Sequence, residues 1–197
     1  SSYNGTLTGS VRINKSDGIL AGAFQGIGAS DSYVQFPNLG SLGGINNRTY
    51  LMWVYTDATS GVEGIFGDHN SVTDKGFHIK KSSASLLILA DAETLTITNF
   101  FTAQKWTHIA VALNNSGGVS VYRNGNLFHN STLSDHTGTN QYVIGSGRDT
   151  FNDFIEGWDG YIDELGVVNK TMTAEEINDT YRLRSGYYYW NVNVTDQ

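Results

Sequence analysis

Short runs of alternating apolar and polar residues recur along most of this chain, a pattern typical of half-buried β-strands. Residues 106–113 show it clearly, because Ile109, Val111 and Leu113 fall on one face. Asn124-Gly125 between two such runs predicts a tight hairpin, since both residues tolerate the positive φ angles of a two-residue turn. Further strands are expected at residues 33–36, 50–55, 64–67, 76–80, 85–89, 95–98, 119–123, 126–128, 142–145 and 160–168.

One segment has helical character. Thr173 is followed three residues later by Glu176, which is the spacing of a capping box, and Ile177 and Tyr181 then fall on one side. These features predict a short helix over about 174–182. The 197 residues suit one large domain, so the predicted fold class is all-β: a two-sheet antiparallel sandwich with one short C-terminal helix.

The last twelve residues, 186–197, read as an additional strand. Tyr188, Trp190, Val192 and Val194 share one face of this strand, and Asn193 lies on the other. The first face has the bulk to complete a hydrophobic core, and burial would contribute about 1.5–3 kcal/mol per large apolar side chain before ordering costs.

Composition and charge exclude several classes of protein. The 23 glycines and single proline fit short strands joined by turns. A net charge of −7 argues against a nucleic-acid partner, which needs clustered Lys and Arg. No apolar run approaches the roughly 18 residues of a membrane span. The chain has no cysteine, so it forms no disulfides and no thiolate zinc site.

Acceptor motifs for N-glycosylation are frequent, at about twice the number that the Asn, Ser and Thr content predicts by chance. One interpretation is an exported glycoprotein, and the other is a chain that is merely rich in Asn and Thr. The motifs begin at Asn4, Asn14, Asn47, Asn114, Asn130, Asn169, Asn178 and Asn193.

Catalytic patterns are weak, and no enzyme and no required cofactor are predicted. Asp91 and Glu93 form the only acidic pair at alternating spacing, without the third carboxylate of sandwich-fold glycosidases. The five histidines are scattered. Trp158, Tyr55 and Phe151 lie near expected loops and strand ends and could stack on sugars, but core packing is the favoured role of each.

Several stretches together resemble the laminin G-like, concanavalin A-like jelly rolls of surface proteins. The resemblance covers nearly all of residues 4–183 and implies a jelly-roll sandwich, but says little about ligand. It rests on Asn4-Gly5-Thr6-Leu7, residues 30–37, Tyr50-Leu51-Met52-Trp53-Val54, Trp106–Val111, residues 121–125, residues 160–165 and residues 172–177.

In that family a strand with a pattern such as Tyr-Trp-Asn-Phe usually precedes the Asn-Gly-Thr-Leu strand. Residues 1–185 resemble a jelly roll that lacks this first strand, and Tyr189-Trp190-Asn191-Val192 resembles the strand itself. The resemblance implies that residues 186–197 supply the missing strand, either to their own sandwich or to a neighbour's.

The resemblance also makes Asp163 a candidate ligand of a structural calcium ion, which takes oxygen ligands. Strict alternation would place Asp163 on one strand face with Tyr161, Leu165 and Val167. A carboxylate among such apolar neighbours needs a partner. The alternative is an Asp163 satisfied by backbone amides or by a nearby Lys or Arg.

The favoured function is a non-enzymatic, glycosylated subunit outside the cell or on its surface. It would assemble head to tail into a filament or surface array, a homopolymer, by C-terminal strand donation. The alternative is an adhesion module that binds a surface carbohydrate or protein with loops at one end of the sandwich. N-linked glycans are the other expected partners.

Overall fold

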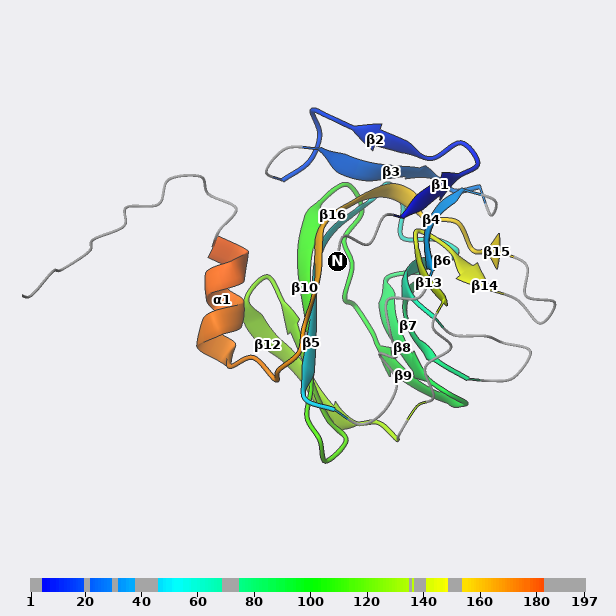
Figure 1. Cartoon of the computed structure of the whole chain (residues 1–197). Coiled ribbons are helices and arrows are strands. Elements are labelled where there is room, and N and C mark those ends of the chain that lie inside the picture. Colours follow the sequence, from blue (N-terminus) through cyan, green and yellow to red (C-terminus); the bar gives the residue numbers. More distant parts are fainter. Residues whose placement is uncertain are drawn as a thin grey trace, which may run out of the picture.

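The structure, a computed structural model, describes residues 5–19, 22–29, 32–37, 46–68, 75–134, 136, 141–148 and 154–182. Two seven-stranded sheets face each other, as the two curved layers of Figure 1 show. Every strand pair in them is antiparallel. The predicted class, an all-β jelly-roll sandwich with one short C-terminal helix, is therefore confirmed.

The chain crosses between the two sheets several times. The first sheet has the order β1 (Thr6–Thr8), β4 (Tyr33–Pro37), β13 (Gln141–Ile144), β6 (Val62–Gly67), β7 (Phe77–Ser82), β8 (Ser85–Ala90) and β9 (Glu93–Ile97). The second sheet has the order β12 (Asn126–Thr132), β11 (Gly118–Arg123), β10 (Trp106–Leu113), β5 (Arg48–Thr56), β16 (Asp159–Val168), β3 (Ala23–Ile27) and β2 (Arg12–Asn14). A small hairpin joins β14 (Gly147–Arg148) to β15 (Phe154–Ile155).

The hydrophobic core lies between the two sheets. Alternate residues of each strand face inward, as period-two patterning requires, and β10 buries Ile109 and Val111 as predicted. β5 contributes Tyr50 and Met52, and Tyr50 stacks on Phe77 of the first sheet with ring centroids 4.6 Å apart. The opposite face of the second sheet points away from this core, so its side chains can contact α1 or a ligand.

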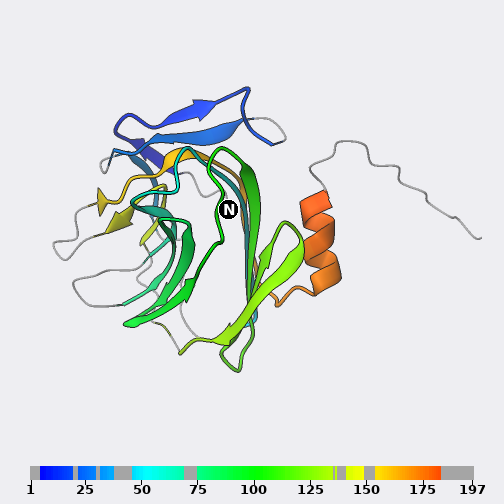
Figure 2. The ribbon, with the colours of Figure 1, turned by 180° about the vertical axis from the view of Figure 1, so that it is seen from behind.

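One part of that opposite face is covered by α1 (Ala174–Arg182), which Figures 1 and 2 both place outside the second sheet. The capping box is present, because Thr173 N donates to Glu176 Oε2 (2.9 Å) and Glu176 N donates to Thr173 Oγ1 (3.3 Å). Ile177 is buried against Ala110 and Ala112 of β10. The predicted helix therefore has the predicted bounds.

Four strands were not expected from the sequence, namely β2, β3 and the two strands of the small hairpin, β14 and β15. β2 and β3 are short and surrounded by Gly18, Gly22 and Gly28, a composition that reads as loop. β3 forms because Gly26 allows close approach to β16: a Cβ at Gly26 would lie 2.1 Å from the Trp158 carbonyl oxygen.

The expectation that Asp163 shares a face with Leu165 and Val167 is wrong. A β-bulge between Asp163 and Gly166 shifts the register with β5, and Glu164 there has a φ of 48°. Asp163 pairs with Trp53 on the outer face, whereas Leu165 packs against the core. Because of the extra residue, the alternation of inward and outward side chains in the second half of β16 is shifted by one residue relative to the first half.

No helix in the described ranges is long and apolar enough to cross a membrane. The predicted C-terminal strand, residues 186–197, lies outside the described residues.

Candidate functional site

Three aromatic side chains from adjacent strands meet on the outer face of the second sheet. Tyr55 of β5 pairs in register with Trp106 of β10 on one side and with Tyr161 of β16 on the other. The ring centroids are 5.8 Å apart for Tyr55–Trp106, 5.6 Å for Tyr55–Tyr161 and 6.1 Å for Trp106–Tyr161. All three side chains are only half-buried, so this aromatic patch presents ring surface to solvent.

Polar side chains border the aromatic patch on the side of β2 and β3. Gln25 pairs in register with Tyr161, and its Nε2 lies 3.4 Å from the Tyr161 hydroxyl. The same hydroxyl lies 3.4 Å from Asp17 Oδ2, which also accepts a hydrogen bond of 2.8 Å from Asn14 Nδ2. Carboxylate and amide groups therefore lie beside the aromatic rings, next to the Tyr161 hydroxyl.

Carboxylates lie close enough to the patch to shift the pKa of its groups. Partial burial raises the pKa of Tyr161, and the carboxylates of Asp17 and Asp57 raise it further. Burial and the nearby Asp57 likewise raise the pKa of Asp159, against the attraction of Lys81.

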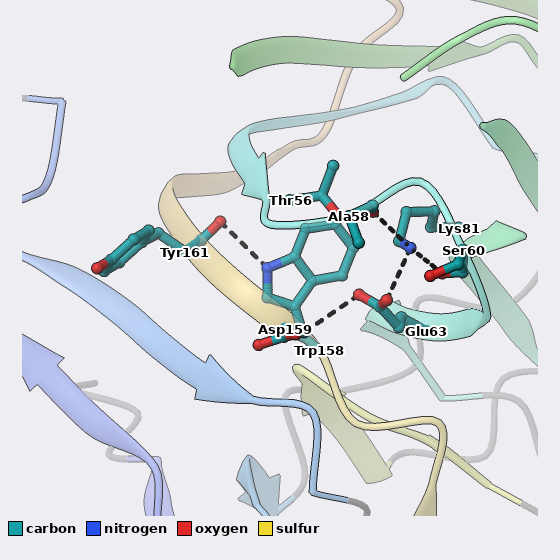
Figure 3. A network of polar contacts seen from close by, with 8 residues as sticks. All are labelled: Thr56, Ala58, Ser60, Glu63, Lys81, Trp158, Asp159 and Tyr161. Carbon is teal, nitrogen blue, oxygen red and sulfur yellow. Dashed lines mark hydrogen bonds and ion pairs between the residues drawn. The ribbon is translucent and has the colours of Figure 1, made fainter. Parts of the chain in front are cut away.

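A buried ion pair supports the strands that carry the patch (Figure 3). Lys81 has no exposed surface, and its Nζ lies 2.7 Å from Glu63 Oε1. The ammonium also donates to the carbonyl oxygens of Ala58 (3.1 Å) and Ser60 (2.7 Å). Burial raises the pKa of Glu63, and the bond to Lys81 opposes that shift. The pair ties the loop after β5 to the first sheet.

The same network holds the start of β16. Glu63 Oε2 accepts a hydrogen bond from Asp159 N (3.1 Å). The buried Trp158 donates from its indole Nε1 to the Tyr161 carbonyl oxygen (3.3 Å). In Figure 3 the Tyr161 ring points away from the ion pair, on the far side of Trp158.

The start of β10, which carries Trp106, is also held by a hydrogen bond to a neighbouring strand. Thr56 ends β5, and its carbonyl oxygen accepts a hydrogen bond from Gln104 N (2.8 Å), just before Trp106. Thr56 Oγ1 also donates to the Ala58 carbonyl oxygen (2.6 Å). Tyr55, Trp106 and Tyr161 are therefore presented by strand ends that are hydrogen-bonded to one another, a rigid base for a binding site.

This arrangement suits a ligand with one apolar face and several hydroxyl groups. An aromatic ring has a negative face that attracts weakly positive C–H groups, and a half-buried ring adds hydrophobic contact area. Carboxylates accept hydrogen bonds from hydroxyls, and amides both donate and accept them. Sugars combine these two kinds of surface.

The three sugar-contact candidates have different outcomes. Tyr55 lies in the aromatic patch, Trp158 is fully buried, and Phe151 lies outside the described residues. Core packing, the favoured role of Trp158, is therefore confirmed. Sequence reasoning missed Trp106 and Tyr161, because only the order β10-β5-β16 brings them beside Tyr55. Their positions near strand ends were the available signal.

Asp163 is satisfied by backbone amides. Its Oδ2 accepts a hydrogen bond from Ile19 N (2.6 Å) and its Oδ1 one from Glu164 N (2.9 Å). Among the described residues no cluster of three His, Cys, Asp or Glu could hold a metal ion. Calcium at Asp163 stays an untested prediction.

The glycosylation motifs in the described ranges belong to the second sheet and α1. Asn47, Asn114, Asn130, Asn169 and Asn178 are exposed, and Asn14 is half-buried beside the patch. Asn47 and the Asn169 motif meet where β5 begins and β16 ends, since Thr171 Oγ1 donates to Asn47 Oδ1 (3.1 Å). Asn4 and Asn193 lie outside the described residues, and glycan occupancy stays a prediction.

The acidic pair considered for catalysis has structural partners. Asp91 accepts hydrogen bonds from Gly76 N (2.8 Å) and Lys75 Nζ (3.0 Å). Glu93 accepts one from Ser134 N (2.7 Å), which lowers the pKa of Glu93. A lowered pKa is the opposite of what a general acid needs near neutral pH.

A small pocket lies at the other end of the sandwich. Its walls are mainly core side chains, and the exposed Asn114 stands at its rim. The residues that line it are Phe77, Leu113, Asn114, Gly117, Gly118, Val119, Leu133, Ser134 and His136.

Residues 28–178 match the Concanavalin A-like lectin/glucanases superfamily, through its Laminin_G_3 family. The match spans more than half of the chain, and this chain belongs to that family. The resemblance inferred from the sequence is thereby confirmed. A search of the curated proteins found no match.

Solved structures of similar fold include binding domains of bacterial neurotoxins. The botulinum neurotoxin serotype D ligand-binding domain, in complex with N-acetylneuraminic acid, has a TM-score of 0.67 and 19% identity over 92% of this chain and 46% of that one. The serotype G binding domain has a TM-score of 0.69 and 15% identity over 94% of this chain and 48% of that one. This chain therefore spans about half the length of these structures, and such low identity establishes the fold alone.

Proposed function

We propose that this protein is a non-enzymatic carbohydrate-binding module whose ligand lies on the aromatic patch. The observation that carries the proposal is the row Tyr55, Trp106 and Tyr161, whose side chains are partly exposed and bordered by Asp17 and Gln25. A pyranose ring would stack its C–H face on the aromatic rings and direct hydroxyls to the carboxylate and amide. A sialic acid in one structural relative supports sugar binding by this fold but not at this patch.

The carboxylates near Tyr161 favour neutral sugars over anionic ones as ligands. Asp17 and Asp57 both act on the Tyr161 hydroxyl, so an anionic sugar would meet like charge there. We expect neutral oligosaccharides to bind more tightly than sialylated or sulfated ones.

The test is a glycan array followed by calorimetry with the best neutral glycan. Trp106→Ala should weaken binding about tenfold or more, since loss of one stacked ring costs on the order of 1.5 kcal/mol. Leu127→Ala is a matched control, because Leu127 is also exposed on the second sheet but belongs to β12. Every protein would carry Asn14→Gln, so that a glycan of the chain itself cannot occupy the patch. Undiminished affinity in Trp106→Ala would exclude the patch.

A second candidate function is head-to-tail assembly, in which residues 186–197 add as a strand to a neighbouring copy. Part of β16 has no strand partner on one side among the described residues, which favours this proposal. Deletion of residues 186–197 should abolish polymers seen by electron microscopy. Polymers that persist without the segment would contradict assembly by strand donation.

The proposed binding module is also expected to be N-glycosylated and to lie outside the cell or on its surface. Exposed acceptor asparagines on the second sheet and α1 support it. Mass spectrometry of the protein from its native source, before and after enzymatic release of N-glycans, would test it.

A further inference from the structure

The second half of β16 has a free edge. β16 pairs with β3 only from Asp159 to Ile162, whereas its pairing with β5 continues to Val168. On the side away from β5, no strand of the described ranges accompanies Gly166–Val168. Alternate backbone N–H and C=O groups of a strand point to each side, so this edge offers donors and acceptors that no described strand uses.

The core is also open beside this edge. Val167 pairs in register with Tyr50, which is 1% exposed in the core, yet Val167 itself is 36% exposed. Leu165 also faces the core and is only half-buried. A core-facing valine with this much exposed surface lacks a neighbour on its free side.

We propose that residues 187–194 of a second copy of this chain pair antiparallel with the free edge of β16. This inference rests on the proposed head-to-tail assembly and names its acceptor. Tyr188, Trp190, Val192 and Val194 would continue the inward row of Leu165 and Val167, and Asn193 would face outward. Backbone hydrogen bonds supply the affinity of such strand addition, and the alternating side chains set its register.

The position of α1 favours a second copy over the chain's own segment. Tyr181, near the end of α1, stacks on Trp53, which pairs with Asp163. The first residue of an antiparallel strand would lie at the other end of the free edge, near Val168. From Trp53, beside the end of α1, that position is about 14 Å away along the strand direction and about 10 Å away across the strands. The link from Arg182 would also descend about 10 Å from the helix to the sheet, a path of about 20 Å.

Residues 183–186 leave no slack for that path. The five steps from Arg182 to residue 187 reach at most about 18 Å when fully extended. Within one chain an antiparallel strand would therefore need a fully extended link or a later start, and a relaxed link would favour a strand parallel to β16. The described strand pairs of the two sheets are all antiparallel, and antiparallel pairs outnumber parallel pairs in proteins. A second copy is free of this restraint.

Cysteine crosslinking tests the acceptor, because the full chain has no cysteine of its own. One full-length copy would carry Val167→Cys, and an isotope-labelled copy would carry Val192→Cys. After treatment with a short bis-maleimide, mass spectrometry should find crosslinked dimers of one labelled and one unlabelled copy. The matched control replaces Val167→Cys by Leu127→Cys on β12, the opposite edge of the same sheet, and should give none.

The other outcomes overturn the inference in distinguishable ways. A double variant that crosslinks only within one chain would show that the segment fills its own edge. Polymers without any Val167 crosslink would keep the assembly proposal but place its acceptor elsewhere. Absence of both polymers and crosslinks would exclude assembly as well as its acceptor.

Discussion

Lys81 is a charged side chain with no exposed surface, and oxygens of Glu63, Ala58 and Ser60 surround its ammonium. Such a site is costly unless every donor has a partner. Its partners join the loop after β5 to the first sheet, and Glu63 in turn holds the backbone of Asp159. A single ion pair therefore positions β5 and β16, two of the three strands that carry the aromatic patch.

Lys81→Met should lower the free energy of unfolding by about 3 kcal/mol at pH 7, because it leaves Glu63 without its cation in a partly buried place. The loss should shrink as the pH falls from 7 to 5, because burial raises the pKa of Glu63 and removal of the Lys81 cation raises it further, which favours the neutral form of the unpaired carboxyl. Urea denaturation measures both values. The double variant Lys81→Met/Glu63→Gln should lose less than the sum of the single variants, and strict additivity would contradict this coupling.

His108 lies on the outer face between Trp53 and Tyr181, and burial lowers its pKa from 6.5 to about 4. The unfolded chain therefore binds a proton at a higher pH than the folded one. The stability linked to neutral His108 is complete above pH 6.5 and is lost as the pH falls toward 4, by up to about 3 kcal/mol.

His108→Phe should flatten that part of the stability profile, because phenylalanine does not titrate. Thermal or urea unfolding of both proteins between pH 4 and pH 7 measures the difference. Parallel profiles for the wild type and the variant would contradict a neutral, buried His108.

At the scale of elements, the alternation of residues 106–113 and the turn Asn124-Gly125 are local signals, and they predicted β10 and the β11–β12 hairpin correctly. β3 escaped prediction because its strand character comes from pairing with β16, not from its glycine-rich sequence. The bulge after Asp163 escaped for a similar reason, since a single extra residue reverses which face Leu165 occupies. Register also decides which aromatic residues meet, so the sequence singled out Tyr55 but not its neighbours in the patch.

The capping box of α1 gives a prediction for one element. Thr173→Ala should destabilise the protein by about 1 kcal/mol, because Glu176 N would lose its side-chain acceptor. Asp179→Ala, an exposed change in the same helix, is the control and should stay within about 0.5 kcal/mol of the wild type. Equal effects of the two substitutions in urea denaturation would contradict the capping role.

At the scale of the whole molecule, the second sheet carries three different surfaces. The aromatic patch lies where β5 ends, the glycosylation motifs of Asn47 and Asn169 meet where β5 begins, and the free edge belongs to the second half of β16. The α1 helix covers the outer face between the first two. This separation allows sugar binding and self-association to be altered independently.

Val167→Lys should therefore abolish assembly and leave glycan binding unchanged. A lysine on the inward row would hinder an apolar strand from packing there, but its ammonium could reach solvent from this exposed position. Sedimentation velocity and a glycan titration on the same sample measure the two properties. A variant that still assembles would contradict the acceptor edge, whereas a variant that loses both properties would contradict their independence.

Indole N–H resonances offer the most direct measurement of the proposed function. The chain has four tryptophans, and the structure places Trp106 in the patch, Trp53 beneath Tyr181 and Trp158 in the core. A heteronuclear NMR titration with the best neutral glycan from the array should shift the Trp106 indole signal in a saturable way and leave those of Trp53 and Trp158 in place. Saturable binding with an unmoved Trp106 signal, or no binding of any neutral glycan, would contradict a carbohydrate site on the aromatic patch.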